Sequence, residues 1–409
     1  MPIEIRNVHE DELTSFVETM STGFLNRPDV SRIADGVKSL WDLNRVWGAF
    51  DAERIRGTLR TWATELTVPG GARIPAAAVT NVTVLPTHRR QGIMRRLITT
   101  EHAAARERGE SASLLYSAEY PIYGRFGYGP ACETATWTVD AGATSFHGPP
   151  ASGVDFAPPD EATRETLKAV FEARRMVAAG EIRRRDFRWD FDLGLREDAW
   201  DPRWKGFIVV HRDGSGRADG YVRYRAREKW EKNQPRNVLE VDELLATTDE
   251  AYRSLWRFLV EIDWVGTVVA ERRSPAERLP WLLTNARAAH LSDLADGMWV
   301  RLLDVPRALE ARAYEREASL VLEVVDAEAP GGRIRVRLDA SSDGATCRST
   351  TESADLTVGV DALGAAYLGG TSLSAAAAAS GADEHRPGAL GTADPLLRTL
   401  DVPWCATFF

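Results

Sequence analysis

Two arginines and a glycine stand at the joint between two residue patterns in NVTVLPTHRRQGIMRRLI, which runs from Asn81 to Ile98. The first part is rich in β-branched residues, as strands are, whereas the part after Gly92 has the apolar spacing of an amphipathic helix. A helix N-terminus carries exposed backbone N–H groups and partial positive charge, and a glycine lets an anion approach the backbone. We therefore predict an anion site, suited to a pyrophosphate, at Arg89, Arg90 and Gly92.

This joint is distinct from two common phosphate loops, because neither GxxxxGK[ST] nor GxGxxG is present. In our interpretation the two arginines act together with the backbone amides from Gln91 to Met94. The preceding strand, from Val82 to Val84, would run beside the rest of the ligand. The alternative is a cluster of exposed arginines, which the dipole of the following helix disfavours at this place.

A second group of candidate residues lies in SAEYPIYGRFGYGPA, from Ser117 to Ala131, where three glycines and three tyrosines follow a predicted strand. A turn packed with aromatic side chains explains Tyr120 and Tyr128. Tyr123 stands apart, because IYGRFGYG occurs together with the arginine loop. A phenol beside a reacting group can act as a general acid.

The composition is that of an ordinary soluble protein: of 409 residues, 44% are hydrophobic and 27% charged, and the net charge is −9. The negative charge argues against broad nucleic-acid binding. No apolar run reaches the roughly 18 residues of a membrane helix, and the first residues lack the plan of a signal peptide. Three cysteines without a CxxC pair argue against a zinc site or a disulfide framework. We expect a cytoplasmic protein with no metal, no nucleic acid and no membrane partner.

One basic cluster, Arg183, Arg184 and Arg185, could suggest a nucleic-acid patch. Asp186 and Asp190 follow it at once. We interpret the cluster as a solvated face or a set of local ion pairs.

The elements that must position these residues fall into three predicted domains, at 1–147, 148–304 and 305–409. In the first, a strand–turn–strand pair (VWGAFDAERIRGTLRTWATEL) precedes the strand–helix joint, and two more strands follow, ASLLYSA and a last strand ETATWTVD. This order resembles the GNAT acetyltransferase fold. The segment HGPPASGVDFAPPD, at 147–160, is rich in proline and glycine and is interpreted as a linker.

The second predicted domain repeats this plan but changes the joint. Its strand NVLEVDELLA is followed by Thr248, Asp249 and Glu250, with no glycine before the next predicted helix. Acidic groups there would repel a phosphate, and no bare amide cradle forms readily. We predict a duplicated domain that kept the fold and lost the site.

The third predicted domain has strands at SLVLEVVD, GRIRVRLD and ADLTVGV, followed by helical pieces in an alanine-rich region. The chain ends in DVPWCATFF, which is too hydrophobic for a free tail. Terminal residues fray unless something holds them, so this end is expected to be held.

Taken together, VTVLPTHRRQG, IYGRFGYGPA and the terminal PWCATFF resemble the Eis (enhanced intracellular survival) family of N-acetyltransferases. The resemblance implies an α/β (α+β) chain of tandem GNAT folds, the second degenerate, followed by a domain similar to sterol carrier proteins. It implies acetyl-CoA as the co-substrate and transfer to primary amines, at several positions of aminoglycosides or similar polyamines or on lysine side chains. It also implies a hexamer built as a trimer of dimers.

The resemblance implies roles for single residues. Tyr123 would be the general acid and the carboxylate of Phe409 the general base, although a tail that merely docks is the alternative for Phe409. Phe24 would wall the amine pocket, and Trp41 would be either a second wall or plain core. The cofactor-binding residues would be Val82, Thr83, Val84, Arg89, Arg90, Gln91, Gly92, Ile93, Met94, Arg95, Ala118 and Glu119.

Two positions depart from the family pattern. Met94 stands where the acetyl-CoA loop has a small residue, and Asn26 stands where some relatives have an acidic pocket residue. Three functions remain open: an aminoglycoside or polyamine N-acetyltransferase, a lysine acetyltransferase with the same site, and a non-catalytic acyl-CoA or lipid-binding module. A wide acidic pocket would favour the first, and an aromatic C-terminus with Tyr123 favours an enzyme over the third.

Overall fold

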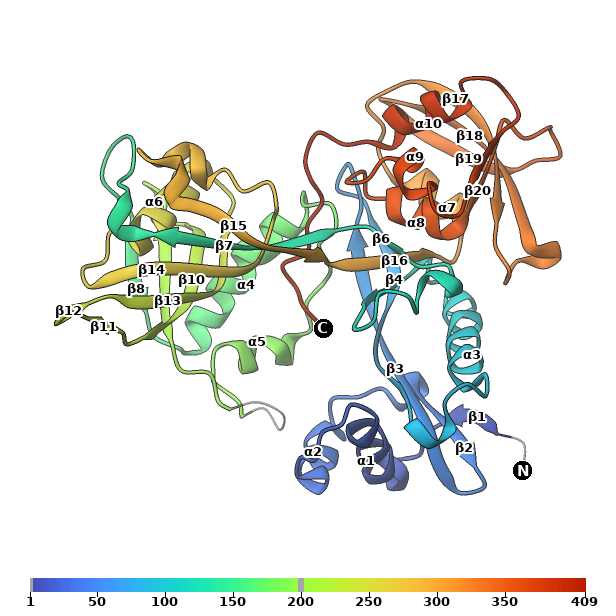
Figure 1. The fold of residues 1–409 in the computed structure, drawn as a ribbon, viewed down its shortest axis with the longest axis horizontal. Helices are drawn as coiled ribbons and strands as arrows, with labels where there is room; N and C mark the ends of the chain where they lie inside the picture. Colours follow the sequence, from blue (N-terminus) through green and yellow to red (C-terminus); the bar gives the residue numbers. More distant parts are fainter. Residues whose placement is uncertain (1–2, 198–201) are drawn as a thin grey trace.

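The computed structural model describes residues 3–197 and 202–409 and arranges them in three units. Figure 1 shows the N-terminal unit at the bottom, the middle of the chain at the left and the C-terminal unit at the upper right. In this described part of the chain, no helix has both the length and the apolar composition to cross a membrane.

The first sheet has seven strands in the order β1-β2-β3-β4-β5-β16-β6. Its strands are β1 (Glu4–Asn7), β2 (Val46–Asp51), β3 (Arg54–Thr67), β4 (Arg73–Val84), β5 (Ala112–Tyr116), β16 (Met298–Leu302) and β6 (Gly129–Pro130). Only β4 and β5 are parallel, because the helix α3 (Ile93–Glu107) carries the chain back between them. The helices α1 (Leu13–Gly23) and α2 (Val30–Val37) share a buried apolar cluster with β2 and β3.

Helix α3 follows from its residue spacing. Ile93 and Leu97, four positions apart, lie on one face and are buried in a cluster with Leu59 and Leu115 of the sheet. Gly92 precedes the helix in the left-handed region, with φ of 75°. The predicted strand–helix joint is therefore present.

The second sheet also has seven strands, in the order β15-β7-β14-β13-β10-β9-β8. Its strands are β15 (Ala289–Asp296), β7 (Glu133–Asp140), β14 (Val265–Arg273), β13 (Asn237–Ala246), β10 (Ala218–Arg227), β9 (Phe207–Arg212) and β8 (Val154–Ala157). Its helices are α4 (Glu161–Arg175), α5 (Asp186–Asp192) and α6 (Asp249–Val260), and a short hairpin is formed by β11 (Trp230–Glu231) and β12 (Gln234–Pro235). Strand β13, helix α6 and the parallel strand β14 repeat the plan of β4, α3 and β5.

The second strand–helix joint is closed by its own side chains. Thr248 caps α6, because its hydroxyl accepts a hydrogen bond from the N–H of Ala251 at 3.1 Å and donates one to Asp219 at 2.7 Å. Asp249 and Glu250 lie in the first turn of the helix. At this joint the N–H of Ala251 is therefore occupied by Thr248, and the carboxylates of Asp249 and Glu250 disfavour an anion.

Two predictions about strands are wrong. ETATWTVD was expected to end the first sheet, but as β7 it lies in the second sheet between β15 and β14. Strand β16, from the second predicted domain, takes the corresponding place in the first sheet between β5 and β6. Figure 1 shows this crossing, with β15 and β16 running from one sheet into the other. The segment predicted as a linker at 147–160 contains β8, which extends the edge of the second sheet.

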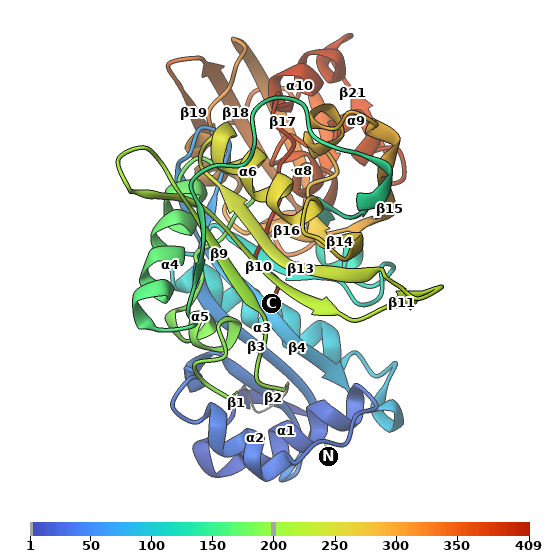
Figure 2. The same ribbon diagram turned by 90° about the vertical axis from the view of Figure 1, so that its left-hand side faces the viewer.

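The third unit is a five-stranded sheet in the order β19-β18-β17-β20-β21. Its strands are β17 (Ala318–Val325), β18 (Arg333–Ser341), β19 (Gly344–Ser349), β20 (Leu356–Gly359) and β21 (Ala382–Glu384), and its helices are α7 (Val305–Ala311), α8 (Val360–Ala366), α9 (Leu373–Ala376) and α10 (Ala389–Leu397). Helix α8 packs on β16 and β6, which joins this unit to the first sheet. In Figure 1 the chain end C lies between the first and second sheets, and in Figure 2 it lies near the centre of the view, where the two sheets overlap.

Candidate active site

Strands β4 and β5 diverge after a short parallel pairing. Residues 76–78 pair with residues 112–114, but β4 continues to Val84 and β5 to Tyr116. Among the described residues, the β5 side of residues 81–84 therefore has no strand partner. An extended ligand with amide groups can pair with such an open strand edge as an added strand does.

A bulge at Asn81 opens this edge. Asn81 has a φ of 55°, a left-handed value that asparagine tolerates better than most residues, and the register with β3 shifts between Thr58 and Arg60. The Thr58 hydroxyl donates to the Asn81 carbonyl at 2.8 Å, and Arg60 Nε donates to the Asn81 side chain at 2.8 Å. The bend in β4 is thus held from the neighbouring strand.

The predicted anion cradle lies beyond the end of β4. Arg89, Arg90 and Gln91 are exposed, and both Arg90, with φ of 64°, and Gly92 have left-handed backbones. A Cβ built at Gly92 would meet no other atom within 4 Å, so the space before the amides of α3 is open. The side chain of Ile93 is buried, and this residue can offer only its backbone to a ligand. The arrangement fits a pyrophosphate bound at a helix N-terminus.

We expect Arg90→Ala to raise the Michaelis constant for acetyl-CoA at least about tenfold, because a charge-assisted phosphate contact contributes roughly 1.5–3 kcal/mol. Steady-state thiol release measures the effect. The exposed Arg316 of the third unit gives a matched control, Arg316→Ala, which should leave the constant unchanged. If the Michaelis constant for acetyl-CoA is the same in both variants and the parent, Arg90 does not contribute to pyrophosphate binding.

A cavity of about 440 Å³, called here the donor cavity, continues from the open edge of β4. Val82, Ala118 and Tyr123 line it from the first unit, together with the half-exposed Phe24. Glu119 is exposed beside it and is not part of the lining. The volume lies within the ~300–1,000 Å³ common for small-molecule sites.

Residues of the second sheet complete the donor cavity. Thr134, Arg272 and Asp296 line it from β7, β14 and β15. The hydroxyls of Ser117 and Thr134 are buried and have no hydrogen-bond partner among the described residues. Both residues line the donor cavity, and their unpaired hydroxyls are exceptions to the rule that buried polar groups are paired.

Tyr123 sits at the base of the donor cavity, just before the short 3₁₀ turn Gly124–Phe126. It is 8% exposed and packs edge-on against Tyr128, with ring centroids 5.9 Å apart. Burial, and then the charge of Glu119, raise the pKa of Tyr123 to about 12. The phenol therefore keeps its proton at neutral pH and is able to donate it.

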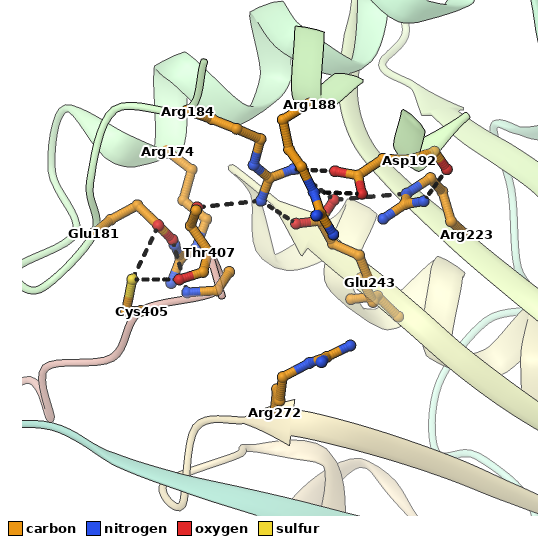
Figure 3. Close-up of polar contacts among 12 residues, drawn as sticks. Arg174, Glu181, Arg184, Arg188, Asp192, Arg223, Glu243, Arg272, Cys405 and Thr407 are labelled. Atoms are coloured by element: carbon orange, nitrogen blue, oxygen red, sulfur yellow. Dashed lines mark hydrogen bonds and ion pairs between the residues drawn. The ribbon is translucent and has the colours of Figure 1, made fainter. Parts of the chain in front are cut away.

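The chain end is held in place by a buried ionic cluster (Figure 3). The Glu181 carboxylate accepts the Ala406 N–H at 2.9 Å and the Cys405 thiol at 3.4 Å, and Arg174 neutralises it at 3.3 Å. Trp404 donates its indole N–H to the Arg272 carbonyl at 3.0 Å. The expectation that the tail is held is thus confirmed.

The last residues are fixed by a second anchor and by aromatic contacts. Arg184, paired with Glu243 at 2.7 Å, donates to the Thr407 hydroxyl at 3.3 Å. Although burial opposes it, the Arg184 guanidinium lowers the pKa of Glu243 to about 2. The half-buried Phe409 ring meets Trp62 at 4.8 Å and Tyr116 at 5.1 Å between centroids.

Tyr116 offers a test of this positioning, because its hydroxyl donates to the Thr407 carbonyl at 3.0 Å. We expect Tyr116→Phe to cost about 1–3 kcal/mol of stability and to lower turnover several-fold, since the carbonyl loses its donor and the tail loosens. Tyr314→Phe is the matched control, because Tyr314 makes the same kind of bond, to the Leu309 carbonyl at 2.6 Å, inside the third unit. A Tyr116 variant that loses stability yet keeps full turnover would make this bond purely structural.

A second cavity, called here the acceptor cavity, has a volume of about 200 Å³ and is lined by Trp41, Arg60 and Trp62. Trp41 packs edge-on against Phe16 and so serves both as a wall and as part of a core cluster. Asn81 and Phe409 line both cavities.

Six of the sixteen predicted site residues line these two cavities: Phe24, Val82, Ala118, Tyr123 and Phe409 line the donor cavity, and Trp41 lines the acceptor cavity with Phe409. The other ten, Thr83, Val84, Arg89 to Arg95 and Glu119, lie outside both linings. The residues that sequence reasoning missed come from other parts of the chain: Ser117 and Arg60 from the first sheet, Thr134, Arg272 and Asp296 from the second, and Arg185 from the segment before α5. Of these, Ser117 begins the tyrosine-rich stretch and Arg185 belongs to the basic cluster, both of which were singled out in the sequence. The three arginines of the basic cluster have different environments. Arg183 is exposed, Arg184 forms a buried ion pair with Glu243, and Arg185 lines the acceptor cavity.

Three domain families account for most of the chain. One acetyltransferase (GNAT) domain matches residues 4–131, another acetyltransferase (GNAT) domain matches residues 180–302, and the sterol carrier protein domain matches residues 305–406. The fold and these matches define a GNAT acetyltransferase with a duplicated domain and a sterol-carrier-like unit, as predicted. The chain belongs to the Eis family: N-acetyltransferase Eis of Mycobacterium bovis BCG is 34% identical over 343 residues, which cover 81% of this chain and 80% of the relative.

Other relatives agree with this assignment. An uncharacterized N-acetyltransferase of Streptomyces griseus is 42% identical over 419 residues, with 100% of both chains covered. The crystal structure of Eis1 from Mycobacterium abscessus has a TM-score of 0.86 at 34% identity, covering 99% of this chain and 100% of that one. A GCN5-related N-acetyltransferase from Anabaena variabilis, with a TM-score of 0.83 over 100% of both chains at 18% identity, shows the fold alone.

Proposed function

We propose that this chain transfers the acetyl group of acetyl-CoA to a primary amine by direct attack, at the point where the donor and acceptor cavities meet. The observation that carries the proposal is the shared lining of the two cavities, because Asn81 and Phe409 border both. A donor bound along β4 and an amine entering past Trp41 would approach each other there.

Acetyl-CoA supplies an acetyl group activated as a thioester. The amides and arginines at the start of α3 would hold its pyrophosphate, and the open edge of Val82, Thr83 and Val84 would pair with its amide-bearing arm. The side chain of Thr83 points the other way, against Gly23 of α1, which leaves the backbone as the part of this residue available to a ligand.

Tyr123 acts on the leaving group. As the C–N bond forms and the C–S bond breaks, its phenol donates a proton to the departing sulfur. The amine nitrogen sheds two protons overall, one before attack and one as the amide forms. The departing sulfur gains one proton, from Tyr123, and Tyr123 is reprotonated from solvent. The net result is one proton on the thiol of coenzyme A and one proton released to solvent.

The first of these protons needs a base, because an ammonium group with a pKa near ~10 is mostly charged at neutral pH. We assign this role to the carboxylate of Phe409. A terminal carboxylate has an ordinary pKa of only ~3.3–3.7. The Phe409 ring packs on Trp62 and Tyr116, and the residue lines both cavities, so its carboxylate is fixed near the place where the amine would arrive.

One assay tests the proposal directly. Thiol release from acetyl-CoA is followed with kanamycin, with a lysine peptide, with simple alkylamines, or with no amine, and the products are checked by mass for acetylation. Amine-dependent release with an N-acetylated product supports the proposal. Release that needs no amine, or none with any amine, would leave only a hydrolase or a binding module. The hexamer remains a prediction, which light scattering tests as six times the 45.2 kDa chain.

A further inference from the structure

Among residues 3–197 and 202–409, the acceptor cavity is lined by four arginines, Arg60, Arg185, Arg188 and Arg196, and by one carboxylate side chain, Glu197. Strongly charged surfaces of one sign attract ligands of the other sign and repel their own. This charge is opposite to the one that a polycationic acceptor would require.

Arg60 and Arg185 have no acidic partner among the described residues. Arg60 is buried on β3, donates only to the Asn81 side chain, and lies with its guanidinium carbon 4.5 Å from the Trp41 ring centroid. Arg185 lies 4.3 Å above the rings of both Trp62 and Phe187. Other buried arginines have anionic or carbonyl partners, since Arg184 is paired with Glu243 and Arg312 donates to the Tyr367 and Leu397 carbonyls.

The electrostatic consequence is visible at both side chains. Burial, and then the charge of Arg185, lower the pKa of Arg60 well below its usual range. Burial, and then the charge of Arg188, lower the pKa of Arg185 to about 10. Both shifts have the direction expected of cations placed together without an anion between them.

The acids near the acceptor cavity do not cancel this charge. Glu197 is paired with Arg32 at 2.7 Å, outside the lining, and Asp192 is paired with Arg188 at 2.9 Å. The Phe409 carboxylate stands at the transfer point, where the amine itself must arrive. Arg60 and Arg185 are thus not neutralised by these described acids and are available to a bound molecule.

We propose that the acceptor is a small primary amine that carries an anionic group, a carboxylate or a phosphate, which Arg60 and Arg185 bind while the amine faces Phe409. This inference rests on the proposed function and narrows it. Arg60 and Trp62, two positions apart, share one face of β3, and Phe409 packs on Trp62. A molecule lying along this face reaches from the arginines to the transfer point, with the aromatic walls against its apolar middle.

The test uses amines of equal chain length that differ only at the far end. These are 5-aminopentanoate (anionic), pentylamine (neutral) and 1,5-diaminopentane (cationic), with 4-aminobutyl phosphate to compare the two kinds of anion. We expect kcat/KM to fall in the order anionic, neutral, cationic, with at least about a tenfold step from anionic to neutral. Whichever of 5-aminopentanoate and 4-aminobutyl phosphate has the higher kcat/KM identifies the anionic group that is recognised.

Variants assign the preference to the arginines. Arg185→Gln should reduce the ratio of kcat/KM for 5-aminopentanoate over pentylamine at least about tenfold, whereas Arg185→Lys should keep most of it. Arg183→Gln is the matched control, because Arg183 is exposed and outside the lining. Acetylation of all three amines at similar rates, or best with 1,5-diaminopentane or kanamycin, would overturn this inference and leave the proposed function standing. Acetylation of no amine at all would overturn both.

Discussion

A chain that carries three additional glycines after Phe409 should lose acetyl transfer by at least about 10²-fold, the scale of general acid–base catalysis. The extension keeps both terminal phenylalanines and their packing but replaces the carboxylate at that position by a peptide bond. The anchors at Glu181 and Thr407 lie upstream and remain intact. Thiol release and product mass measure the loss, and the melting temperature should change little.

The matched control carries the same three glycines before Met1 and should retain full activity. Amidation of the terminal carboxyl group gives a second, smaller change at the same atom and should act like the extension. Full turnover in the extended or the amidated chain would show that the tail only docks. A base would then have to be sought elsewhere around Asn81.

Replacement of Tyr123 by phenylalanine should lower kcat roughly 10²-fold or more and leave the Michaelis constant for acetyl-CoA unchanged, because the proton donor matters only as sulfur departs. Tyr120→Phe is the matched control, since Tyr120 belongs to the same loop but is exposed and outside the donor cavity. A Tyr123 variant with near-full turnover would make Tyr123 a structural aromatic like Tyr128.

The pH profile gives an independent readout of the same residue. A phenol whose pKa is raised to about 12 stays protonated between pH 7 and 10, so no fall in rate caused by deprotonation of Tyr123 should occur in that range. In this range the rate should rise or stay level as the amine loses its proton. A fall in rate with an apparent pKa near ~10, present in the parent and absent in the phenylalanine variant, would contradict the burial of this proton donor.

Local patterns allowed the arginine loop to be predicted. The left-handed backbone at this turn favours glycine, which is Gly92, and the four-residue spacing of Ile93 and Leu97 predicts a helix with one apolar face. Both signals come from residues close together in the sequence. The hydrophobic tail was predictable for the same reason, because nine consecutive residues carry the signal. What the tail contacts was beyond reach, since Glu181 and Arg184 are far from it in sequence.

The exchange of strands could not be predicted from local pattern. Strand β7 alternates buried and less buried positions, and β16 is buried throughout. Either pattern suits a strand in either sheet, and neither indicates which strand is its neighbour. The positive charge of the acceptor cavity could not be predicted either, because its arginines are far apart in the sequence. Arg60 lies on β3 and Arg185 in a loop of the second unit, and only the folded chain places both against Trp62.

The strand exchange also constrains the order in which the protein is made. Strand β16 fills the place between β5 and β6, so the first sheet is incomplete until residue 302 has left the ribosome. From Pro130 this takes about 170 further residues, or roughly 10–30 s at typical rates of synthesis. During that interval the exposed edge of β5 needs protection from other chains. We expect nascent chains arrested near residue 147 to aggregate or bind chaperones, and arrest beyond residue 302 to relieve both.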